Sequence, residues 1–432
     1  MKIPSLSEHF KNRVPSVIRQ AQIEYSKRED KNNVEVINLA IGNVSLPMHP
    51  AMQKRLQEVG QTFFSDGVVK YTSTIGNNET RDAFLNILQA EGIDTSNIFS
   101  NITDGGSSAM ELMMLGVCGP GSNEPIMLLD PAYTNYLEFA KRLAINVVTL
   151  PRVINDDGSF VPLNIKEIEA KIKKYSPKAL LIIPYDNPTG QFLSQQILIE
   201  LSRVCIKYGV WLVSDEAYRP LFYNDDEHSS IWKIDEKSVP GINGCRISIE
   251  SSSKVWNACG LRIGALLTDN EEFHLKAISE YTANLCANAI GQKIFGALAH
   301  ESHEKIQIWY ESQRNYYKRI LFNLKNEFQK QIPGLIISEP AAALYFVIDF
   351  RKVCNKRFDA STFINYCARY GKVDIADGSY TLLLAPMNGF YSNSKIGKTQ
   401  LRVAIVETPE KMLLAPKILS KLFSNFNNNT SQ

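Results

Sequence analysis

The sequence predicts an α/β fold with a mainly parallel β-sheet and a second, smaller α+β region towards the C-terminus. Its 432 residues are enough for two or three domains. From about residue 100 to residue 268, short apolar runs alternate with longer amphipathic runs. Several of the short runs are apolar throughout, as expected for strands that helices cover on both faces.

The first region begins with an extended stretch that ends at Thr103. The strands predicted after it are Pro125–Leu129, Ile145–Leu150, Ala179–Pro184, Val210–Ser214, Arg246–Glu250 and Ile263–Thr268. The helices predicted between them are Ser107–Cys118, Asn135–Leu143, Ile165–Tyr175 and Ser194–Tyr208. Strands that alternate with helices in this way favour βαβ units and parallel pairing.

The chain after this region has a different pattern. A long helical stretch is predicted from Cys286 to about Lys330, with a break near His300–Glu304. The strands predicted next are Leu335–Ser338, Leu344–Phe350, Tyr380–Leu384 and Leu401–Val406, and the helices are Ala360–Tyr370 and Pro409–Phe423. Strands grouped apart from helices indicate an α+β unit.

The composition excludes several classes of protein. Apolar residues make up 44% and charged residues 21% of the chain, which excludes a disordered or fibrous protein. The net charge of +2 provides no large basic surface for nucleic acid. No apolar run approaches the roughly 18 residues of a membrane span, and Met1–Phe10 has no signal-peptide core. Seven cysteines without a C-x-x-C pair indicate reduced thiols in a cytoplasmic protein.

Ligands of open α/β sheets bind outside the carboxyl ends of the strands, so the residues after each strand are site candidates. After Thr103, the segment Asp104-Gly105-Gly106-Ser107 precedes an apolar helix, whose free N–H groups favour an anion such as phosphate. Taken alone, a glycine turn with a serine N-cap is the simpler explanation. Tyr133, after the next strand, can stack on a flat ligand or simply pack.

Polar side chains follow two later strands. Asn187, in Asn187-Pro188-Thr189-Gly190, offers an amide donor at a fixed place or forms a plain turn. Asp215 follows an apolar strand and precedes Tyr218. A carboxylate buried there needs a cation or a donor, unless it only caps a helix.

Lys254 lies between a strand and an apolar segment, within Ser251-Ser252-Ser253-Lys254. Desolvation and a nearby cation such as Arg262 lower the pKa of a lysine, which makes the neutral amine available as a nucleophile. A surface lysine and a structural ion pair at Arg262 are the plain alternative.

One ligand has groups for all these residues. Its phosphate would bind at Gly105–Ser107, Ser251 and Arg262. Its flat ring would stack on Tyr133, its ring nitrogen would pair with a buried Asp, and its phenolic oxygen would face Asn187 and Tyr218. Its aldehyde would react with Lys254. Pyridoxal 5′-phosphate combines these groups, and its sites pair a Schiff-base lysine with an acidic partner of the ring nitrogen.

At this point the sequence resembles the class I and II aminotransferases of the fold-type I pyridoxal-phosphate family. The family signature S-x-S-K followed by G-x-R-x-G occurs as Ser251-Ser252-Ser253-Lys254 and Gly260-Leu261-Arg262-Ile263-Gly264. Further family motifs occur in the right order, and they are Tyr71 with Gly76 and Arg81, Asn187-Pro188-Thr189-Gly190, Asp215-Glu216-Ala217-Tyr218 and Leu401-Arg402-Val403. The likeness extends from about Asn38 to Glu410.

The resemblance implies the cofactor and a role for each matching residue. The three catalytic residues are Lys254, which forms the Schiff base and moves a proton, Asp215, which keeps the pyridine nitrogen protonated, and Tyr218. The further cofactor-binding residues are Gly106, Ser107, Tyr133, Asn187, Ser251, Arg262 and Tyr71, the last reaching the phosphate of a partner subunit. The substrate α-carboxylate is expected at Arg402, whose planar guanidinium suits bidentate binding, and at Gly42. No metal is expected.

The resemblance also implies an aspartate-aminotransferase-like architecture: a three-layer large domain with a mainly parallel seven-stranded sheet, plus a smaller α+β domain. Residues 1–48 are expected to form an N-terminal arm and part of the small domain, 49–300 the large pyridoxal-phosphate-binding domain, and 301–432 the C-terminal small domain. The small domain closes over substrate in this family. A homodimer with shared active sites is implied, acting in amino acid metabolism and biosynthesis, with no nucleic-acid or membrane partner.

The expected reaction transfers an amino group from an L-amino acid to a 2-oxo acid. A carbon–sulfur lyase or decarboxylase on the same fold is the alternative, because these enzymes keep the same lysine, aspartate and arginines. A non-catalytic regulator is the third hypothesis, although only about forty polar residues precede the family match. No residue can be assigned to a distal substrate carboxylate, and aromatic donors are compatible with Tyr133, Trp256 and Tyr345.

Overall fold

The centre of the molecule is a seven-stranded sheet in the order β2-β8-β7-β6-β5-β3-β4. The computed structural model describes residues 3–224, 228–375 and 378–430. The strands of this sheet are β2 (Phe99–Thr103), β3 (Ile126–Asp130), β4 (Val147–Pro151), β5 (Ala179–Ile182), β6 (Trp211–Asp215), β7 (Arg246–Ser251) and β8 (Gly264–Thr268). Strands β7, β6, β5, β3 and β4 pair in parallel, whereas β8 is antiparallel to both β7 and β2. The predicted mainly parallel sheet is confirmed.

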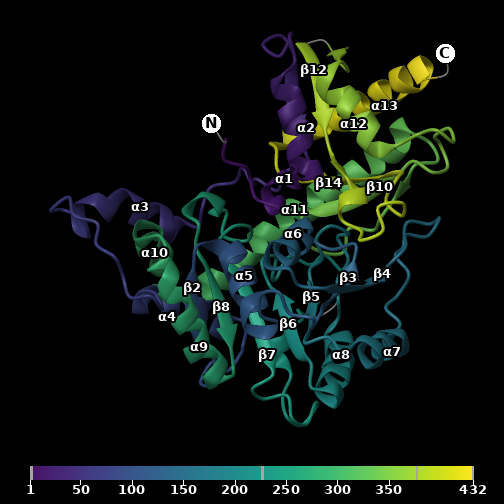
Figure 1. Ribbon diagram of the computed structural model, residues 1–432. Helices are drawn as coiled ribbons and strands as arrows, with labels where there is room; N and C mark the ends of the chain where they lie inside the picture. Colours follow the sequence, from purple (N-terminus) through teal and green to yellow (C-terminus); the bar gives the residue numbers. More distant parts are fainter. Residues whose placement is uncertain (1–2, 225–227, 376–377, 431–432) are drawn as a thin grey trace.

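Both faces of this sheet are buried, which explains the unbroken apolar strands. In β3, Ile126 and Leu128 pack in one hydrophobic cluster, whereas Met127 and Leu129 pack in the other. The helices of the first cluster are α5 (Gly105–Val117), α6 (Thr134–Leu143) and α9 (Glu271–Tyr281). The helices α7 (Ile165–Tyr175) and α8 (Gln195–Tyr208) contribute to the second cluster, on the opposite face (Figure 1). This arrangement is the predicted three-layer α/β unit.

Two smaller sheets bring the N-terminal segment and the C-terminal region together. The first has the order β1-β12-β11, and its strands are β1 (Glu35–Asn38), β11 (Val373–Ile375) and β12 (Gly378–Leu383). The second has the order β13-β14-β10-β9, and its strands are β9 (Ile336–Ile337), β10 (Tyr345–Asp349), β13 (Ala385–Pro386) and β14 (Gln400–Ala404). Because β1 pairs in parallel with β12, residues near the start of the chain share a sheet with residues near its end.

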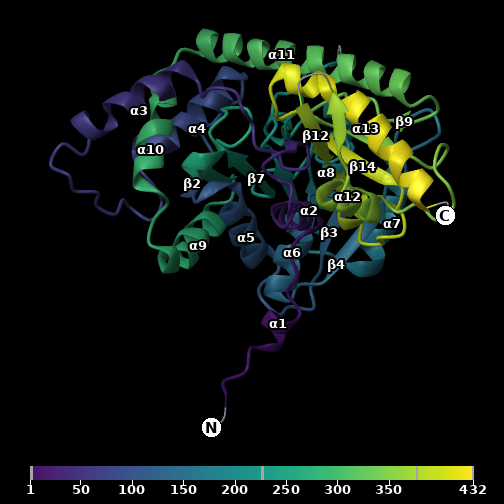
Figure 2. The same cartoon turned by 90° about the horizontal axis from the view of Figure 1, so that it is seen from above.

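The remaining helices surround these sheets. Helices α2 (Val17–Ser26), α12 (Ala360–Arg369) and α13 (Pro409–Thr430) lie beside the smaller sheets (Figure 1). The others are α1 (Glu8–Lys11), α3 (Pro50–Thr62), α4 (Asn78–Ala90), α10 (Ala289–Phe295) and α11 (His303–Gln331). Helix α11 runs along one side of the molecule, and the N-terminal residues with α1 project away from it (Figure 2).

Helix boundaries follow the capping residues. The side chain of Ser302 caps α11, so the predicted break near His300–Glu304 is confirmed. Helix α5 begins at Gly105, earlier than the predicted start at Ser107. The domain boundaries at residues 48 and 300 stay predictions. None of the helices in the described part of the chain has the length and apolar character that crossing a membrane requires.

Candidate active site

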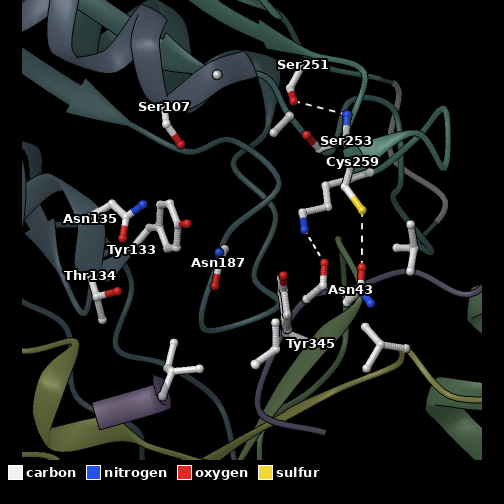
Figure 3. A pocket seen from close by; sticks show the side chains of 18 of the residues that line it. Asn43, Ser107, Tyr133, Thr134, Asn135, Asn187, Ser251, Ser253, Cys259 and Tyr345 are labelled. Carbon is white, nitrogen blue, oxygen red and sulfur yellow. Dashed lines mark hydrogen bonds between the residues drawn. The ribbon is translucent and has the colours of Figure 1, made fainter. Parts of the chain in front are cut away.

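A cavity of about 940 Å³ lies at the carboxyl ends of the parallel strands, next to the smaller sheets. The predicted site residues that line it are Gly42, Gly106, Ser107, Tyr133, Asn187, Asp215, Tyr218, Ser251, Lys254, Arg262 and Arg402. In Figure 3, Ser107 and Ser251 lie at one end of the cavity and Tyr345 at the other, with Tyr133 and Asn187 between them. The structure therefore brings together residues that are far apart in the sequence.

Tyr71 is the one predicted site residue that does not line this cavity. It lies in the connection between α3 and α4, and 77% of its surface is exposed. Its side chain is thus available to a neighbouring molecule.

One end of the cavity is built for an anion. A Cβ added to Gly105, which has a φ of +75°, would lie only 2.5 Å from an Arg262 guanidinium nitrogen, so a side chain there would displace the arginine. Arg262 itself adopts a left-handed φ of 55° and donates to the carbonyl of Cys259 at 3.0 Å. The start of α5, the Arg262 guanidinium and the hydroxyl groups of Ser107 and Ser251 all line this end. Together they offer a helix N-terminus, a cation and two hydroxyl donors to a phosphate.

The Lys254 amine reaches across the cavity to the N-terminal segment. Its Nζ donates a hydrogen bond to the carbonyl oxygen of Gly42. A Cβ at Gly42 would lie 3.0 Å from this Nζ and 2.6 Å from the Tyr345 hydroxyl, so glycine leaves the space that the amine needs. The predicted nucleophile is therefore inside the cavity, and a partner from a distant segment holds it in place.

Asp215 ends β6 as a buried carboxylate without a cationic partner in an ion pair among the described residues. The Tyr136 hydroxyl donates to its Oδ2 at 2.5 Å, and the backbone N–H of Ala217 donates to its Oδ1 at 3.1 Å. Burial raises the pKa of Asp215 to about 6, although the Tyr136 hydrogen bond and the charge of Lys254 act in the opposite direction. A protonated ring nitrogen placed beside it would compensate this charge.

The sequence prediction missed Tyr136. Its hydroxyl group is fully buried, and its burial together with Asp215 raises its pKa well above the ordinary value. It lies in the first turn of α6, three residues after the N-cap residue Tyr133, and the two rings meet edge to face with their centroids 6.0 Å apart. That spacing is the only signal in the sequence that links Tyr136 to the site.

A chain of hydrogen bonds connects the cofactor side of the cavity to its substrate side. The Asn187 amide donates to the Tyr218 hydroxyl at 3.2 Å, and the hydroxyls of Tyr218 and Tyr345 are 2.8 Å apart. Arg402 in turn donates to Asn187 Oδ1 at 2.7 Å and to the carbonyl of Ala40 at 2.6 Å.

Arg402 is only 2% exposed, and its guanidinium lies over the rings of Tyr345 and Phe390 at 4.4 and 4.9 Å. In the described part of the chain no carboxylate forms an ion pair with it, and its Nε has no hydrogen-bond partner. A buried guanidinium without a counter-charge is costly, so the site favours a carboxylate ligand.

These donors fit pyridoxal 5′-phosphate. The anion-binding end suits its phosphate, the uncompensated carboxylate of Asp215 suits its ring nitrogen, and the Lys254 amine suits its aldehyde. Asn187 and Tyr218 present polar groups to its ring oxygen.

Trp256, which the sequence groups with Tyr133 and Tyr345, lies outside the cavity in the described part of the chain. Its side chain is 4% exposed and absent from the residues that line the cavity. It stacks on Trp309 with an interplanar angle of 4° and packs against His49 and Phe295. Tyr133 and Tyr345, in contrast, do line the cavity.

Comparisons with known proteins show the family and the fold of this chain. A family model described as "Aminotransferase class I and II" matches residues 34–412. The aspartate aminotransferase of Pyrococcus horikoshii is 23% identical over 408 residues, which cover 94% of each chain. The glutamate-pyruvate aminotransferase AlaA of Escherichia coli K12 is 24% identical over 351 residues, 79% of this chain and 81% of that one. The structure of a mutant of Thermus thermophilus aspartate aminotransferase is 20% identical to this chain and superposes on it with a TM-score of 0.78. The superposition covers 97% of this chain and 100% of the other, so the two chains share a fold.

Proposed function

Because the chain belongs to the class I and II aminotransferases, which are pyridoxal-phosphate-dependent transferases, we propose that the cavity around Lys254 moves an amino group from an L-amino acid to a 2-oxo acid. One observation carries this assignment. The Lys254 amine, the uncompensated carboxylate of Asp215 and the unpaired guanidinium of Arg402 line the same cavity. The first two match the cofactor, and the third matches a carboxylate that both substrates possess.

When bound, pyridoxal 5′-phosphate supplies an aldehyde that condenses with amines and a protonated ring that accepts electrons released at the substrate Cα. Lys254 would provide the amine that anchors the cofactor. The freed amine would then move a proton from the substrate Cα to the carbon of the cofactor's former aldehyde group, and would move it in the reverse direction when the 2-oxo acid reacts. Its contact with the Gly42 carbonyl holds Nζ at the substrate side. Asp215 keeps a proton at the ring nitrogen, and the Tyr136 hydroxyl orients the Asp215 carboxylate.

The other residues position the two ligands. Gly106, Ser107, Ser251 and Arg262 bind the phosphate, which fixes the ring in the cavity. Tyr133 stacks on the ring, while Asn187 and Tyr218 hold the ring oxygen.

Arg402 and the backbone of Gly42 bind the substrate α-carboxylate. The donor and the acceptor both carry a carboxylate next to the reacting carbon. One guanidinium therefore serves both halves of the reaction, and both take place in the same cavity.

The active enzyme is further proposed to be a homodimer in which Tyr71 reaches the phosphate bound by the partner subunit. Val68, Val69 and Leu285 are about half exposed, and Thr74 donates to the carbonyl of Leu285 at 2.9 Å, so the two loops form one partly apolar surface around Tyr71. Contact with a second copy would cover this surface.

We further propose that residues 49–300 form the large domain and that residues 1–48 and 301–432 form a small domain that closes over substrate. The pairing of β1 with β12 supports this split arrangement. The seven cysteines, each unpaired, support a cytoplasmic place in amino acid metabolism and biosynthesis.

The test is a spectral titration of the cofactor-loaded protein with amino acids, one at a time. A transaminase converts the cofactor to its amino form with a donor amino acid, and a 2-oxo acid reverses the change. Lys254→Ala is expected to lower the rate by at least about 10⁴-fold, because the base and the covalent anchor are both lost. The exposed Lys166→Ala serves as the matched control and should leave the rate unchanged.

Failure of every amino acid to change the spectrum would contradict the assignment. Release of pyruvate and ammonia from a cysteine-type substrate without an acceptor would favour the lyase instead.

A further inference from the structure

Tyr345, the first residue of β10, presents its hydroxyl group to the Lys254 cavity from the side of the smaller sheets. Figure 3 shows its side chain pointing into the cavity. Tyr345 is only 1% exposed, so its hydroxyl needs a hydrogen-bond partner inside the site. The partner is the Tyr218 hydroxyl at 2.8 Å, and the two rings meet edge to face. The proposed function gives Tyr218 a role and leaves Tyr345 without one.

The backbone holds these two tyrosines in a fixed relation. The N–H of Tyr223, shortly after Tyr218, donates to the carbonyl of Ala341 at 2.9 Å. The Tyr223 hydroxyl donates to the carbonyl of Ala343, just before Tyr345. Ala343 has a left-handed φ of 56°, which is uncommon for a residue other than glycine. These contacts therefore fix the turn before β10, and with it the direction of the Tyr345 side chain.

The direction of the hydrogen bond between the two hydroxyls follows from the other partners of Tyr218. The Tyr218 hydroxyl accepts a hydrogen bond from the Asn187 amide at 3.2 Å. A tyrosine hydroxyl carries one proton and two acceptor sites. Under the proposed function, Tyr218 gives its proton to the ring oxygen of the cofactor. Its second acceptor site is then open to Tyr345, so Tyr345 is the donor.

The ring and the hydroxyl of Tyr345 have separate contacts. The Arg402 guanidinium lies over the ring, 4.4 Å from its centroid. A Cβ added to Gly42 would lie 2.6 Å from the Tyr345 hydroxyl and 3.0 Å from the Lys254 Nζ, so both atoms approach the same point. In the described part of the chain, the titratable and charged groups around Tyr345 are Tyr133 of α6, Tyr218, Lys254, Tyr317 of α11 and Arg402 of β14.

We propose that Tyr345 is a positioning residue that acts through Tyr218: its hydroxyl donates to Tyr218 and so strengthens the hydrogen bond that Tyr218 donates to the ring oxygen of the cofactor. This inference rests on the proposed function, with the cofactor joined to Lys254. Hydrogen bonds in a chain polarise one another, so a hydroxyl that accepts a hydrogen bond is a better donor. Stronger donation from Tyr218 withdraws charge from the ring oxygen, which then attracts a proton at Lys254 Nζ less strongly. Tyr345 thereby lowers the pH at which Nζ, once joined to the cofactor, loses this proton.

The test is a spectral pH titration of the cofactor-loaded protein without substrate. The colour of the cofactor joined to Lys254 changes when Nζ loses its proton, so the absorbance gives the pH midpoint of this loss. Tyr345→Phe keeps the ring under Arg402 and removes only the hydroxyl. It should raise the midpoint by about 0.2–0.6 pH unit, because one cooperative contribution to the Tyr218 hydrogen bond is lost. The pH profile of kcat/KM for the amino acid donor should shift by the same amount.

A double-mutant cycle separates action through Tyr218 from a direct effect of Tyr345. Tyr218→Phe should raise the midpoint by about 1–2 pH units, because a hydrogen bond to a charged oxygen is lost. In that background Tyr345→Phe should cause no further change, since its partner is gone. The matched control is Tyr185→Phe. The buried Tyr185 hydroxyl donates to the carbonyl of Ser229 at 2.9 Å and does not line the cavity, so its removal should leave the midpoint unchanged.

An unchanged or lowered midpoint in Tyr345→Phe, or an equal rise in the wild-type and Tyr218→Phe backgrounds, would overturn the inference. Both outcomes leave the proposed transamination intact. A wild type that shows no colour from a cofactor joined to Lys254, or whose colour responds to no amino acid, would instead contradict the proposed function itself.

Discussion

Two buried arginines, Arg219 and Arg402, have opposite surroundings. Arg219 lies beside three buried acidic side chains, at 2.8 Å from Glu91, 3.1 Å from Glu250 and 3.6 Å from Glu216. Among the described residues, Arg402 has only the neutral oxygens of Asn187 and Ala40 as hydrogen-bond partners.

The difference separates a structural arginine from a ligand-binding one. Arg219 contacts acidic residues at the end of α4, at the end of β6 and in strand β7. Its charge is therefore neutralised within the protein. Arg402 carries an unneutralised charge at a cavity, and only a ligand can neutralise it.

The largest effect on folding is expected from Arg219→Met. Removal of the cation leaves buried carboxylates without a partner, which should lower the free energy of unfolding by about 3–5 kcal/mol. Urea unfolding measures this change. The matched control is Arg142→Met, because Arg142 pairs with Glu111 at the surface and is half exposed. That variant should lose no more than about 1 kcal/mol. A similar loss in both variants would show that the buried Arg219 contributes no more to stability than a surface ion pair.

The same substitution at Arg402 should change stability little and catalysis strongly. Arg402→Met removes a buried charge that has no counter-ion, so the free energy of unfolding of the cofactor-free protein should change by no more than about 1–2 kcal/mol. In contrast, kcat/KM for every amino acid should fall about 10²- to 10³-fold, because the α-carboxylate loses its bidentate partner. Stability and single-turnover measurements on the same preparations test both expectations. If Arg402→Met kept the wild-type kcat/KM, Arg402 would not be a ligand-binding arginine.

The smallest effect concerns Glu216, the third acidic side chain around Arg219. Burial raises the pKa of Glu216 to about 8, whereas Arg219 and His228 lower the pKa of Glu91 to about 2 despite its burial. Folded Glu216 therefore keeps a proton that unfolded Glu216 loses near its ordinary value of 4.5. Its stabilising contribution is complete below that value and is lost as the pH rises towards 8.

Glu216→Gln, which cannot ionise, should remove this pH dependence. Relative to the variant, the wild type should lose about 1–2 kcal/mol of unfolding free energy between pH 6 and pH 8. Urea unfolding at several pH values measures the difference, with the exposed Glu271→Gln as control. A constant difference across this range would show that Glu216 is already ionised in the folded protein.

Local patterns were enough to predict the strands and the residues that follow them. Burial on both faces makes β3, β5 and β6 apolar throughout, and a site at the strand ends leaves Asp215, Asn187 and Lys254 next to these runs. The position of Trp256 two residues after Lys254 does not tell which way its side chain points, and in the structure it stacks on Trp309 outside the cavity.

Contacts between distant segments were not predictable in this way. The Tyr136 hydrogen bond to Asp215, the Tyr218 contact with Tyr345 and the Arg402 hydrogen bond to Asn187 each join elements that only folding brings together. No periodicity in the local sequence predicts these contacts.

The sequence by itself determined the α/β class, the cofactor and the chemical groups that hold it, because secondary structure and family motifs depend on neighbouring residues. Only the tertiary structure decided which charges the protein neutralises and which it leaves for a ligand. Arg219 and Arg402 are each a single arginine in the sequence. What distinguishes them is whether carboxylates from other elements lie beside them, since electrostatic interactions depend on distance in space and not on distance along the chain.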